Sequence, residues 1–358
     1  ISLEKITKKI KLAILKNEDP IDHLKWVTAC ENYNKSIDYV VLDLTVETWL
    51  EDINAYSPDI LLLKPSGKTS LYRALYQERL EILVNELNYK SFPSLEEVRI
   101  YENKKYLSYW AKAHDLPQPK TWIFYNRKEA LKSINFMKFP LVGKINIGAS
   151  GKGVEFLHSK NQAKKYFKRA FTDGLVSRIG PKLTDGKLIQ RAWQKFTHPK
   201  ELINRLKTYK AIAMDSQKGF IILQEFIKHD YEWRAVRIGD SYFAHKKIVS
   251  KKKASGTLIK EYETPPPELL NFVRLLTDNF GFSSVAVDLF EPVKGEYLIN
   301  EIQCIFGQSD PYQMKVDGNP GRYVYKSGRW EFEKGIFNSN ESYDLRLKTA
   351  IRVNGLEL

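Results

Sequence analysis

Hydrophobic and polar positions follow two different periods in the first 92 residues of the chain. Short apolar runs at 10–15, 38–44 and 59–64 have the length of β-strands. The stretches 20–34 and 70–89 carry apolar residues at the spacing of amphipathic helices. Strands that alternate with helices favour a doubly wound sheet of parallel strands. We therefore expect an α/β unit at the N-terminus.

The pattern becomes more varied after residue 92. One long helix is predicted over 94–115, and the prolines of the following LPQP sequence end it. The next predicted elements are a strand, a helix, a second strand and a basic helix, at 121–125, 126–136, 139–144 and 159–174. From residue 223 onwards short strands joined by tight turns dominate, and the segment from 311 has the pattern of hairpins with glycine turns.

These changes divide the chain into four predicted parts. They are an α/β part with a linker helix at 1–118, a mixed part at 119–222, a strand-rich part at 223–310, and a hairpin-rich tail at 311–358 whose role the sequence does not indicate. A chain of 358 residues, 43% of them hydrophobic, can form two or three packed cores. The predicted class is therefore α/β (α+β) with several subdomains.

The composition narrows the kinds of partner. A net charge of +14 attracts anions such as nucleotides, acidic substrates or nucleic acid. No helix-turn-helix, zinc-finger or RNA-binding signature is present, which argues against nucleic acid. Cys30 and Cys304 form no CxxC pair, as in proteins of a reducing cytoplasm, and no apolar run approaches the roughly 20 residues that span a bilayer. We expect a cytoplasmic protein without a membrane span, and a homodimer is left open.

Two glycine-containing loops raise the question of a phosphate site. The sequence FPLVGKINIGASGKGV at 139–154 places Lys144 after an apolar strand and glycines at 148, 151 and 153. A second loop, at 65–70, contains Gly67-Lys68-Thr69 between a strand and a helix. A P-loop needs a further glycine at position 62, where the chain has Leu62. The second loop is therefore interpreted as an ordinary strand-to-helix turn, although it could still face a substrate.

An acidic hairpin is predicted at 284–303. If Lys294 and Gly295 form its turn, Asp288 lies opposite Glu301, and Gln303 points to the same face. Two facing carboxylates repel each other unless a cation or a shared proton neutralises them. Two acids and an amide oxygen suit Mg²⁺. The alternative is a solvated face, or a register shifted by one residue, which breaks the pairing.

A second hairpin is predicted around Gly239-Asp240, a favoured two-residue turn. Its register places Glu232 opposite Lys247 and Arg234 opposite His245, so that Glu232, Arg234 and Lys247 share one face. Such a face can form a surface salt bridge of little energetic weight or can line a site for a polyanion.

The order of these parts resembles the ATP-grasp superfamily, on the side of glutathione synthetase and D-alanine–D-alanine ligase. The resemblance covers about residues 1–310. It implies an N-terminal substrate domain at 1–118, a central lid subdomain at 119–222 and a C-terminal subdomain with the metal hairpin at 223–310, with ATP clamped between the last two. It also implies the cofactors ATP and Mg²⁺, as one or two ions, with Mn²⁺ as a substitute.

The resemblance assigns roles to individual residues of this chain. The residues that it implies for nucleotide binding are Lys104 and Lys144 at the phosphates, the covering loop with Gly148, Ser150, Gly151 and Gly153, the adenine-reading stretch with Gln224, Glu225 and Ile227, and Glu232 at the ribose. Arg234 matches an arginine that holds the transferred phosphoryl group, and Lys247 lies near a basic position of the family. Asp288, Glu301 and Gln303 match the metal ligands, although Gln303 stands where Asn is usual, and Asn103 stands where an Asp often precedes the first lysine.

The implied reaction is an ADP-forming ligation of a carboxylate to an amine through an acyl phosphate. The substrates would be small molecules or peptides, with an acidic carboxylate partner and an amino acid, a peptide or an amino sugar as the amine. One alternative is a peptide-modifying ligase that acts on a ribosomal peptide or a protein. A non-catalytic ATP-binding module is an alternative of another class.

Overall fold

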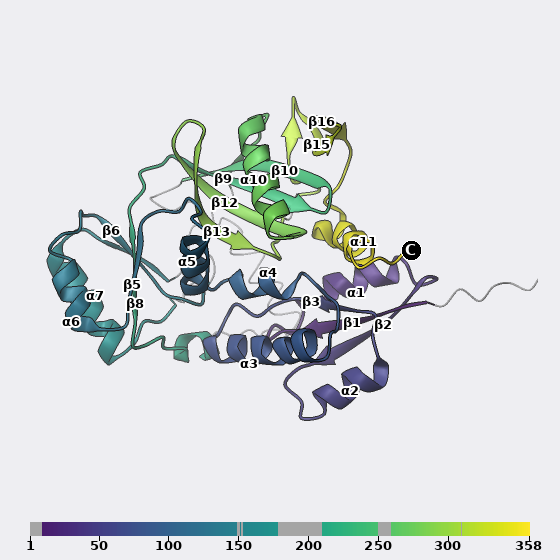
Figure 1. The fold of residues 1–358 in the computed structure, drawn as a ribbon, viewed down its shortest axis with the longest axis horizontal. Helices are drawn as coiled ribbons and strands as arrows, with labels where there is room; N and C mark the ends of the chain where they lie inside the picture. The colour runs from purple at the N-terminus through teal and green to yellow at the C-terminus, as the bar shows by residue number, and fades with distance from the viewer. Residues whose placement is uncertain (1–8, 149–150, 152, 178–209, 250–258, 309) are drawn as a thin grey trace, which may run out of the picture.

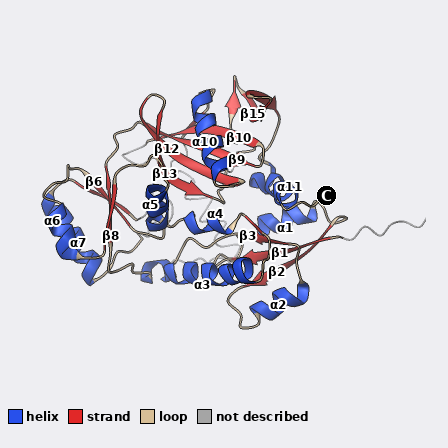
Figure 2. Ribbon diagram, viewed as in Figure 1, coloured by secondary structure: helices blue, strands red, loops and turns tan. Residues whose placement is uncertain are grey.

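The computed structural model describes residues 9–148, 151, 153–177, 210–249, 259–308 and 310–358. Within these residues the strands form three sheets, which Figure 1 shows as three regions of the molecule and Figure 2 shows in relation to the helices. Ser150, which the sequence predicts in a phosphate-covering loop, lies outside the described residues.

The N-terminal sheet is parallel throughout and has the strand order β2-β1-β3-β4. Its strands are β1 (Ile10–Lys16), β2 (Ile37–Asp43), β3 (Ile60–Leu63) and β4 (Ser91–Phe92). Its helices are α1 (Leu24–Glu31), α2 (Trp49–Tyr56) and α3 (Ser70–Glu81), which continues as a π-helical turn at Ile82–Glu86. Figure 1 shows α1 on one face of the sheet and α2 and α3 on the other. The doubly wound sheet predicted from the sequence is confirmed.

The single helix predicted over 94–115 is wrong, because the structure contains two helices there. They are α4 (Leu95–Ile100) and α5 (Lys104–Ala113). Glu102 between them has a φ of 50°, which is left-handed backbone that a continuing helix does not contain. The side chain of Asn103 accepts a hydrogen bond from the Tyr106 amide and starts α5 afresh. The chain therefore turns sharply immediately before Lys104.

The middle sheet is antiparallel and has the order β5-β8-β6-β7. Its strands are β5 (Thr121–Phe124), β6 (Leu141–Lys144), β7 (Val154–Leu157) and β8 (Ile221–Glu225), and its helices are α6 (Arg127–Ser133) and α7 (Lys160–Thr172). The buried residues of α7 are Ala163, Tyr166, Phe167 and Ala170, which recur at helical spacing and pack with the strands in one core. β8 crosses the boundary at 222 that the sequence predicts.

The largest sheet has the main order β13-β12-β9-β10-β15-β14, with β11 beside β10 and β16 beside β15. The strands are β9 (Tyr231–Ile238), β10 (Ser241–Ile248), β11 (Lys260–Glu261), β12 (Ser284–Val293), β13 (Glu296–Gln303), β14 (Lys315–Val316), β15 (Asn319–Lys326) and β16 (Arg329–Lys334). Helix α10 (Pro267–Asn279) packs on it through buried leucines. Both predicted hairpins are confirmed, because Ile238 pairs with Ser241 and Val293 pairs with Glu296.

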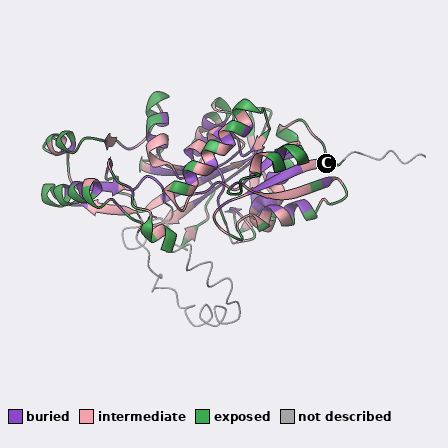
Figure 3. Ribbon diagram, turned by 90° about the horizontal axis from the view of Figure 1, so that it is seen from below, coloured by how far each residue is buried: buried purple, intermediate pink, exposed green. Residues whose placement is uncertain are grey.

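The tail joins two of the other regions. Its hairpin of β15 and β16 is confirmed, and β15 continues the largest sheet through the pair Tyr242 and Tyr323. A 3₁₀ turn (Ser339–Ser342) and helix α11 (Tyr343–Val353) follow, which the sequence pattern does not indicate. Tyr343 and Leu347 pack in the N-terminal core. Figure 3 shows that exposed positions lie mainly on the outer sides of the helices. No helix in the described part of the chain is long and apolar enough to cross a membrane.

Candidate nucleotide site

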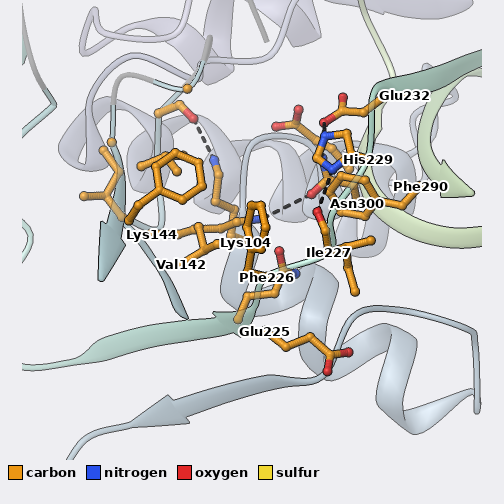
Figure 4. A pocket seen from close by; sticks show the side chains of 18 residues that line it. Lys104, Val142, Lys144, Glu225, Phe226, Ile227, His229, Glu232, Phe290 and Asn300 are labelled. Carbon is orange, nitrogen blue, oxygen red and sulfur yellow. Dashed lines mark hydrogen bonds and ion pairs between the residues drawn. The ribbon is translucent and has the colours of Figure 1, made fainter. Parts of the chain in front are cut away.

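A pocket lies between the middle sheet and the largest sheet, and it collects most of the residues that the sequence predicts for nucleotide binding. The predicted residues that line it are Lys104, Lys144, Gly148, Gly151, Gly153, Gln224, Glu225, Ile227, Glu232 and Glu301. The other predicted residues with described positions are Arg234, Lys247, Asp288 and Gln303, which lie beside this wall without lining it. Figure 4 shows the lining side chains, which come from both sheets and from α5.

The hairpin of β6 and β7 brings its glycines into the pocket by close packing. A Cβ atom at Gly153 would lie 2.1 Å from the Ile145 side chain, and a Cβ atom at Gly143 would lie 2.7 Å from the ring of Tyr166. Tyr166 also donates a hydrogen bond to the Lys144 carbonyl at 3.2 Å. Gly153 is thus required by packing within the hairpin and Gly143 by packing against α7, and this packing holds Lys144 at the end of β6.

Two lysines approach the pocket from different elements. The Lys104 ammonium, in the first turn of α5, donates to the Gly148 carbonyl at 2.6 Å. The Lys144 ammonium donates to the side-chain oxygen of Asn300 at 3.1 Å. Burial, followed by repulsion from Lys104, lowers the pKa of Lys144 to about 8. Both ammonium groups can donate hydrogen bonds to a negatively charged acceptor, and a polyphosphate is such a ligand.

The pocket also has apolar and aromatic walls. Val142, Phe156, Phe226 and Phe290 line it. Glu225 turns its carboxylate away, to the Lys120 amide at 2.7 Å, as Figure 4 shows, so that its backbone rather than its side chain lies at the pocket. A slot with aromatic walls fits the flat face of a base.

His229 is a pocket residue that the sequence analysis missed. Its ring lies 4.6 Å from the Phe290 ring, its Nδ1 is 2.7 Å from the Ile227 carbonyl oxygen, and its Nε2 is 3.6 Å from the Glu232 carboxylate. Burial disfavours the imidazolium, but the neighbouring Glu232 carboxylate and the hydrogen bond to the Ile227 carbonyl raise the pKa of His229. A histidine five residues before Arg234 carries no sequence signal that separates it from a surface residue.

Asn300 was also missed, and a β-bulge explains its position. Asp288 pairs with Glu301 whereas Leu289 pairs with Ile299, so that Asn300 is an extra residue in β13. A bulge turns successive side chains toward the same side. Asn300 and Glu301 therefore both line the pocket, and Asn300 connects Lys144 to Glu232 through a second hydrogen bond of 3.3 Å. No local pattern in the sequence marks the bulge.

Beside the pocket, three adjacent strands, β10, β9 and β12, carry a chain of ion pairs. The Arg234 guanidinium donates to both oxygens of Asp288 at 2.8 Å, and the Lys247 ammonium lies 2.7 Å from Asp288 and 2.9 Å from Glu232. Although burial favours the neutral acid, Arg234 and Lys247 hold the pKa of Asp288 well below its usual range. The predicted register of β9 and β10 is confirmed, because Glu232 pairs with Lys247 and Arg234 with His245.

The predicted metal ligands occupy different environments. Asp288 lies opposite Glu301, as predicted, but both of its oxygens are engaged by cations. Gln303 accepts from Arg234 at 3.3 Å and donates to Glu102 at 3.3 Å. Glu301 makes no hydrogen bond or ion pair with a described residue, and it borders the pocket.

The residues around Glu301 fit a divalent cation. Glu102 is buried, one of its oxygens has no hydrogen-bond partner among the described residues, and burial together with the Glu301 charge raises the pKa of Glu102 to about 8. Two carboxylates that repel each other in a buried place are stabilised by a cation with a preference for oxygen ligands. No three His, Cys, Asp or Glu side chains of the described residues form a preformed metal cluster. Any ion held here therefore needs oxygens from a ligand such as a phosphate, or a movement of Lys247 away from Asp288.

Comparison with known proteins identifies the fold. No protein family model and no curated protein matches the chain. Among solved structures, D-alanine–D-alanine ligase from Bacillus anthracis is 13% identical, with a TM-score of 0.53 over 96% of this chain and 98% of that one. N5-carboxyaminoimidazole synthetase from Staphylococcus aureus in complex with ADP is 10% identical, with a TM-score of 0.55 over 98% and 79%.

A third similar structure is an ATP-grasp protein by name. The RimK domain ATP-grasp protein from Sphaerobacter thermophilus is 13% identical, with a TM-score of 0.50 over 82% of this chain and 90% of that one. At these identities the similarity concerns the arrangement of the elements. The chain has the ATP-grasp fold, as the resemblance in its sequence predicts.

Proposed function

We propose that this protein is an ATP-dependent ligase that forms ADP and joins a carboxylate to an amine through an acyl phosphate. One observation carries the proposal more than any other. Two lysines from separate elements, Lys104 and Lys144, meet Glu301 in a single pocket that also has aromatic walls. A triphosphate with a flat base and a bound cation matches this distribution of charge and apolar surface.

The proposed chemistry has two steps. In the first, an oxygen of the substrate carboxylate attacks the γ-phosphorus of ATP, the bond to the β–γ bridging oxygen breaks, and ADP leaves with the electron pair. In the second, the amine nitrogen attacks the acyl carbon, inorganic phosphate leaves, and the nitrogen loses a proton. Both reactants in the first step are anions, so that their approach depends on cationic groups that are already in place.

The residues of this chain would divide that task. Lys104 and Lys144 bind phosphate oxygens, while the aromatic walls and the 224–227 backbone hold the base. Arg234 stands next to Glu301 and Asp288 and neutralises charge at the transferred phosphoryl group. A magnesium ion held by Glu301, with Asp288 and Gln303 as the further predicted ligands, would shield the phosphate oxygens from the incoming carboxylate. The loop with Gly148, Gly151 and Gly153 borders the phosphates, where it would exclude water from the acyl phosphate.

A screen for ADP release tests the proposal. The purified protein is incubated with ATP, Mg²⁺ and candidate acids, including amino acids, dipeptides, uronic acids and acidic peptides, with and without hydroxylamine. Hydroxylamine captures acyl phosphates, so we expect a hydroxamate and an equal amount of ADP with the correct acid. Formation of AMP in place of ADP would contradict the proposal, and tight ATP binding without turnover of any acid would favour a non-catalytic module.

The affinity for ATP should fall as the pH rises above 8. Lys144 has a pKa lowered to about 8, and phosphate binding requires its protonated form. Below about pH 7 the lysine is already charged and contributes no pH dependence. Well above pH 8 the protonation of Lys144 alone should weaken binding by about tenfold for each further unit, because one proton must be taken up by this group. Calorimetric titration with a non-hydrolysable ATP analogue measures this, since its terminal phosphate is fully ionised there.

Two variants separate the groups behind that pH dependence. Lys144→Arg keeps a positive charge at every pH in this range, so the part of the decline due to Lys144 should disappear. Glu102 also ionises near pH 8 and should account for the remainder, which Glu102→Gln removes. An unchanged decline in Lys144→Arg would contradict the assignment of Lys144 to the phosphates.

Loss of the Asn300 amide should weaken nucleotide binding without unfolding the protein. Asn300→Ala removes the hydrogen bonds that hold the Lys144 ammonium and the Glu232 carboxylate toward the pocket. Hydrogen bonds to charged groups contribute about 1.5–3 kcal/mol, so affinity for the ATP analogue should drop by about 10- to 100-fold. Glu296→Ala, on an exposed residue of the same strand, is the control and should bind normally.

A further inference from the structure

Glu102 is a buried acid that the reaction outlined above does not use. It occupies the turn between α4 and α5, with a φ of 50°, and its side chain is 2% exposed. Left-handed backbone is unfavourable for a residue other than glycine or asparagine. The loop of β3 and α3 passes close to it, since a Cβ atom at Gly67 would lie 3.0 Å from the Glu102 Cγ. Packing from several elements therefore holds this carboxylate in place.

The contacts of Glu102 leave one of its oxygens without a hydrogen bond. Oε1 accepts from the Gln303 amide at 3.3 Å. Oε2 has no hydrogen-bond partner among the described residues, and the Lys104 ammonium, at 3.7 Å, is beyond hydrogen-bond distance and donates to the Gly148 carbonyl instead. An unsatisfied buried carboxylate oxygen is costly unless a ligand completes it.

A second carboxylate faces the same place. Glu301 is close enough for its charge to act on Glu102, and it forms no ion pair of its own with a described residue. Arg73 also acts on Glu102 electrostatically, but its guanidinium donates to the carbonyls of Ser66 and Val98. Lys104 and Arg73 therefore attract Glu102 without donating a hydrogen bond to its Oε2, while two acids and the side chain of Gln303 remain together.

We propose that Glu102 and Glu301 together form a binding site for a divalent cation, in which the linker between α4 and α5 supplies a ligand in addition to those of the acidic hairpin. The proposal rests on the proposed function, because the ion would be the Mg²⁺ that accompanies ATP. Its class is a small, hard cation that prefers carboxylate oxygens and retains positions for phosphate or water. A role of Glu102 limited to orienting Lys104 is the competing explanation.

Mn²⁺ titration monitored by electron paramagnetic resonance distinguishes the two explanations. Free Mn²⁺ is measured against wild type, Glu102→Gln and the exposed control Glu86→Gln, with and without a saturating ATP analogue that carries an imido group between its β- and γ-phosphates. Glutamine matches the size of glutamate, and the melting temperature verifies that each variant is folded. We expect Glu102→Gln to bind one Mn²⁺ fewer than wild type, or to bind it at least about tenfold more weakly, and Glu86→Gln to match wild type.

The outcomes separate the site from the proposed function. If Glu102→Gln needs more analogue for saturation but then binds the same number of Mn²⁺ ions with the same affinity, Glu102 only orients Lys104 and the cation site is refuted. If wild type does not bind the analogue, the proposed function fails. In that case Mn²⁺ binding without nucleotide that Glu102→Gln weakens still supports the site, and equal binding in both proteins refutes it.

Discussion

Glu301→Ala should reduce ADP formation by at least about 10²- to 10³-fold while leaving the protein about as stable as wild type. A cation that neutralises phosphate oxygens contributes several kcal/mol to the transition state, and each 1.36 kcal/mol corresponds to a factor of ten. Stability should change little, because Glu301 makes no hydrogen bond or ion pair with a described residue, and its repulsion of Glu102 is offset by its attraction to Lys144 and Arg234. Rate measurements at saturating ATP and thermal unfolding provide the two readouts.

Glu296→Ala is the matched control for this prediction. It removes an exposed carboxylate from the same strand, and both its rate and its melting temperature should equal those of wild type. Full turnover by Glu301→Ala would contradict the assignment of Glu301 to the metal. A large loss of stability would show instead that Glu301 supports the fold. We do not expect this, because its side chain forms no hydrogen bond or ion pair with a described residue.

The register of the two hairpins could be predicted from the sequence because tight turns determine it locally. Gly239-Asp240 and Lys294-Gly295 favour two-residue turns, and counting from the first turn gives every partner in its hairpin. In the acidic hairpin the count gives Asp288 opposite Glu301 because two irregularities between the turn and this pair offset each other. The facing pairs Glu232 with Lys247 and Asp288 with Glu301 follow from that count. The parallel N-terminal sheet was predictable for a similar reason, since strands and helices alternate there with clear periodicity.

The parts that were missed depend on contacts between distant residues. The pairing of β12 with β13 departs from a regular register at two places. At one of them Asn300 is the extra residue, and its side chain lines the pocket. The break at Glu102 needs its carboxylate to be buried beside Gln303, 201 positions away along the chain. Periodicity alone treats 94–115 as one amphipathic helix, because it contains no information about such a partner.

Gln303 illustrates why a motif position and a side-chain role can differ. The spacing places Gln303 where a third metal ligand is expected, and the structure shows its side chain in contact with Arg234 and Glu102. Its amide, however, is used to connect Arg234 with Glu102. A role of Gln303 as a metal ligand requires these two hydrogen bonds to rearrange when a nucleotide binds. Glu301 requires no such change, because it makes no hydrogen bond or ion pair with a described residue.

Arg234→Met should lower both activity and stability. The guanidinium holds both oxygens of Asp288, whose side chain is 3% exposed, and its removal leaves Lys247 as the remaining cationic partner that the structure shows for Asp288. Breaking a buried ion pair from one side costs about 3–5 kcal/mol of unfolding free energy. Activity should fall by at least about 10²-fold, because a positive centre at the transferred phosphoryl group is lost. Chemical denaturation and ADP release measure the two effects.

The double variant Arg234→Met/Asp288→Leu separates the two roles of the arginine. Replacing both members of a buried pair by apolar residues is often close to neutral for stability, so most of the lost unfolding free energy should return. Activity should not return, because neither side chain can act on phosphate or metal. Arg237→Met is the activity control on the same strand, because Arg237 lies outside the pocket and ADP release should stay normal. It removes an ion pair with the exposed Asp278, which should contribute about 1 kcal/mol or less, and hydrogen bonds to the Gly239 carbonyl and the Thr277 hydroxyl. Recovery of ADP release in the double variant would mean that Arg234 serves the fold alone. The transferred phosphoryl group would then need another positive partner. Lys144 and Lys104 are the candidates, because both line the pocket.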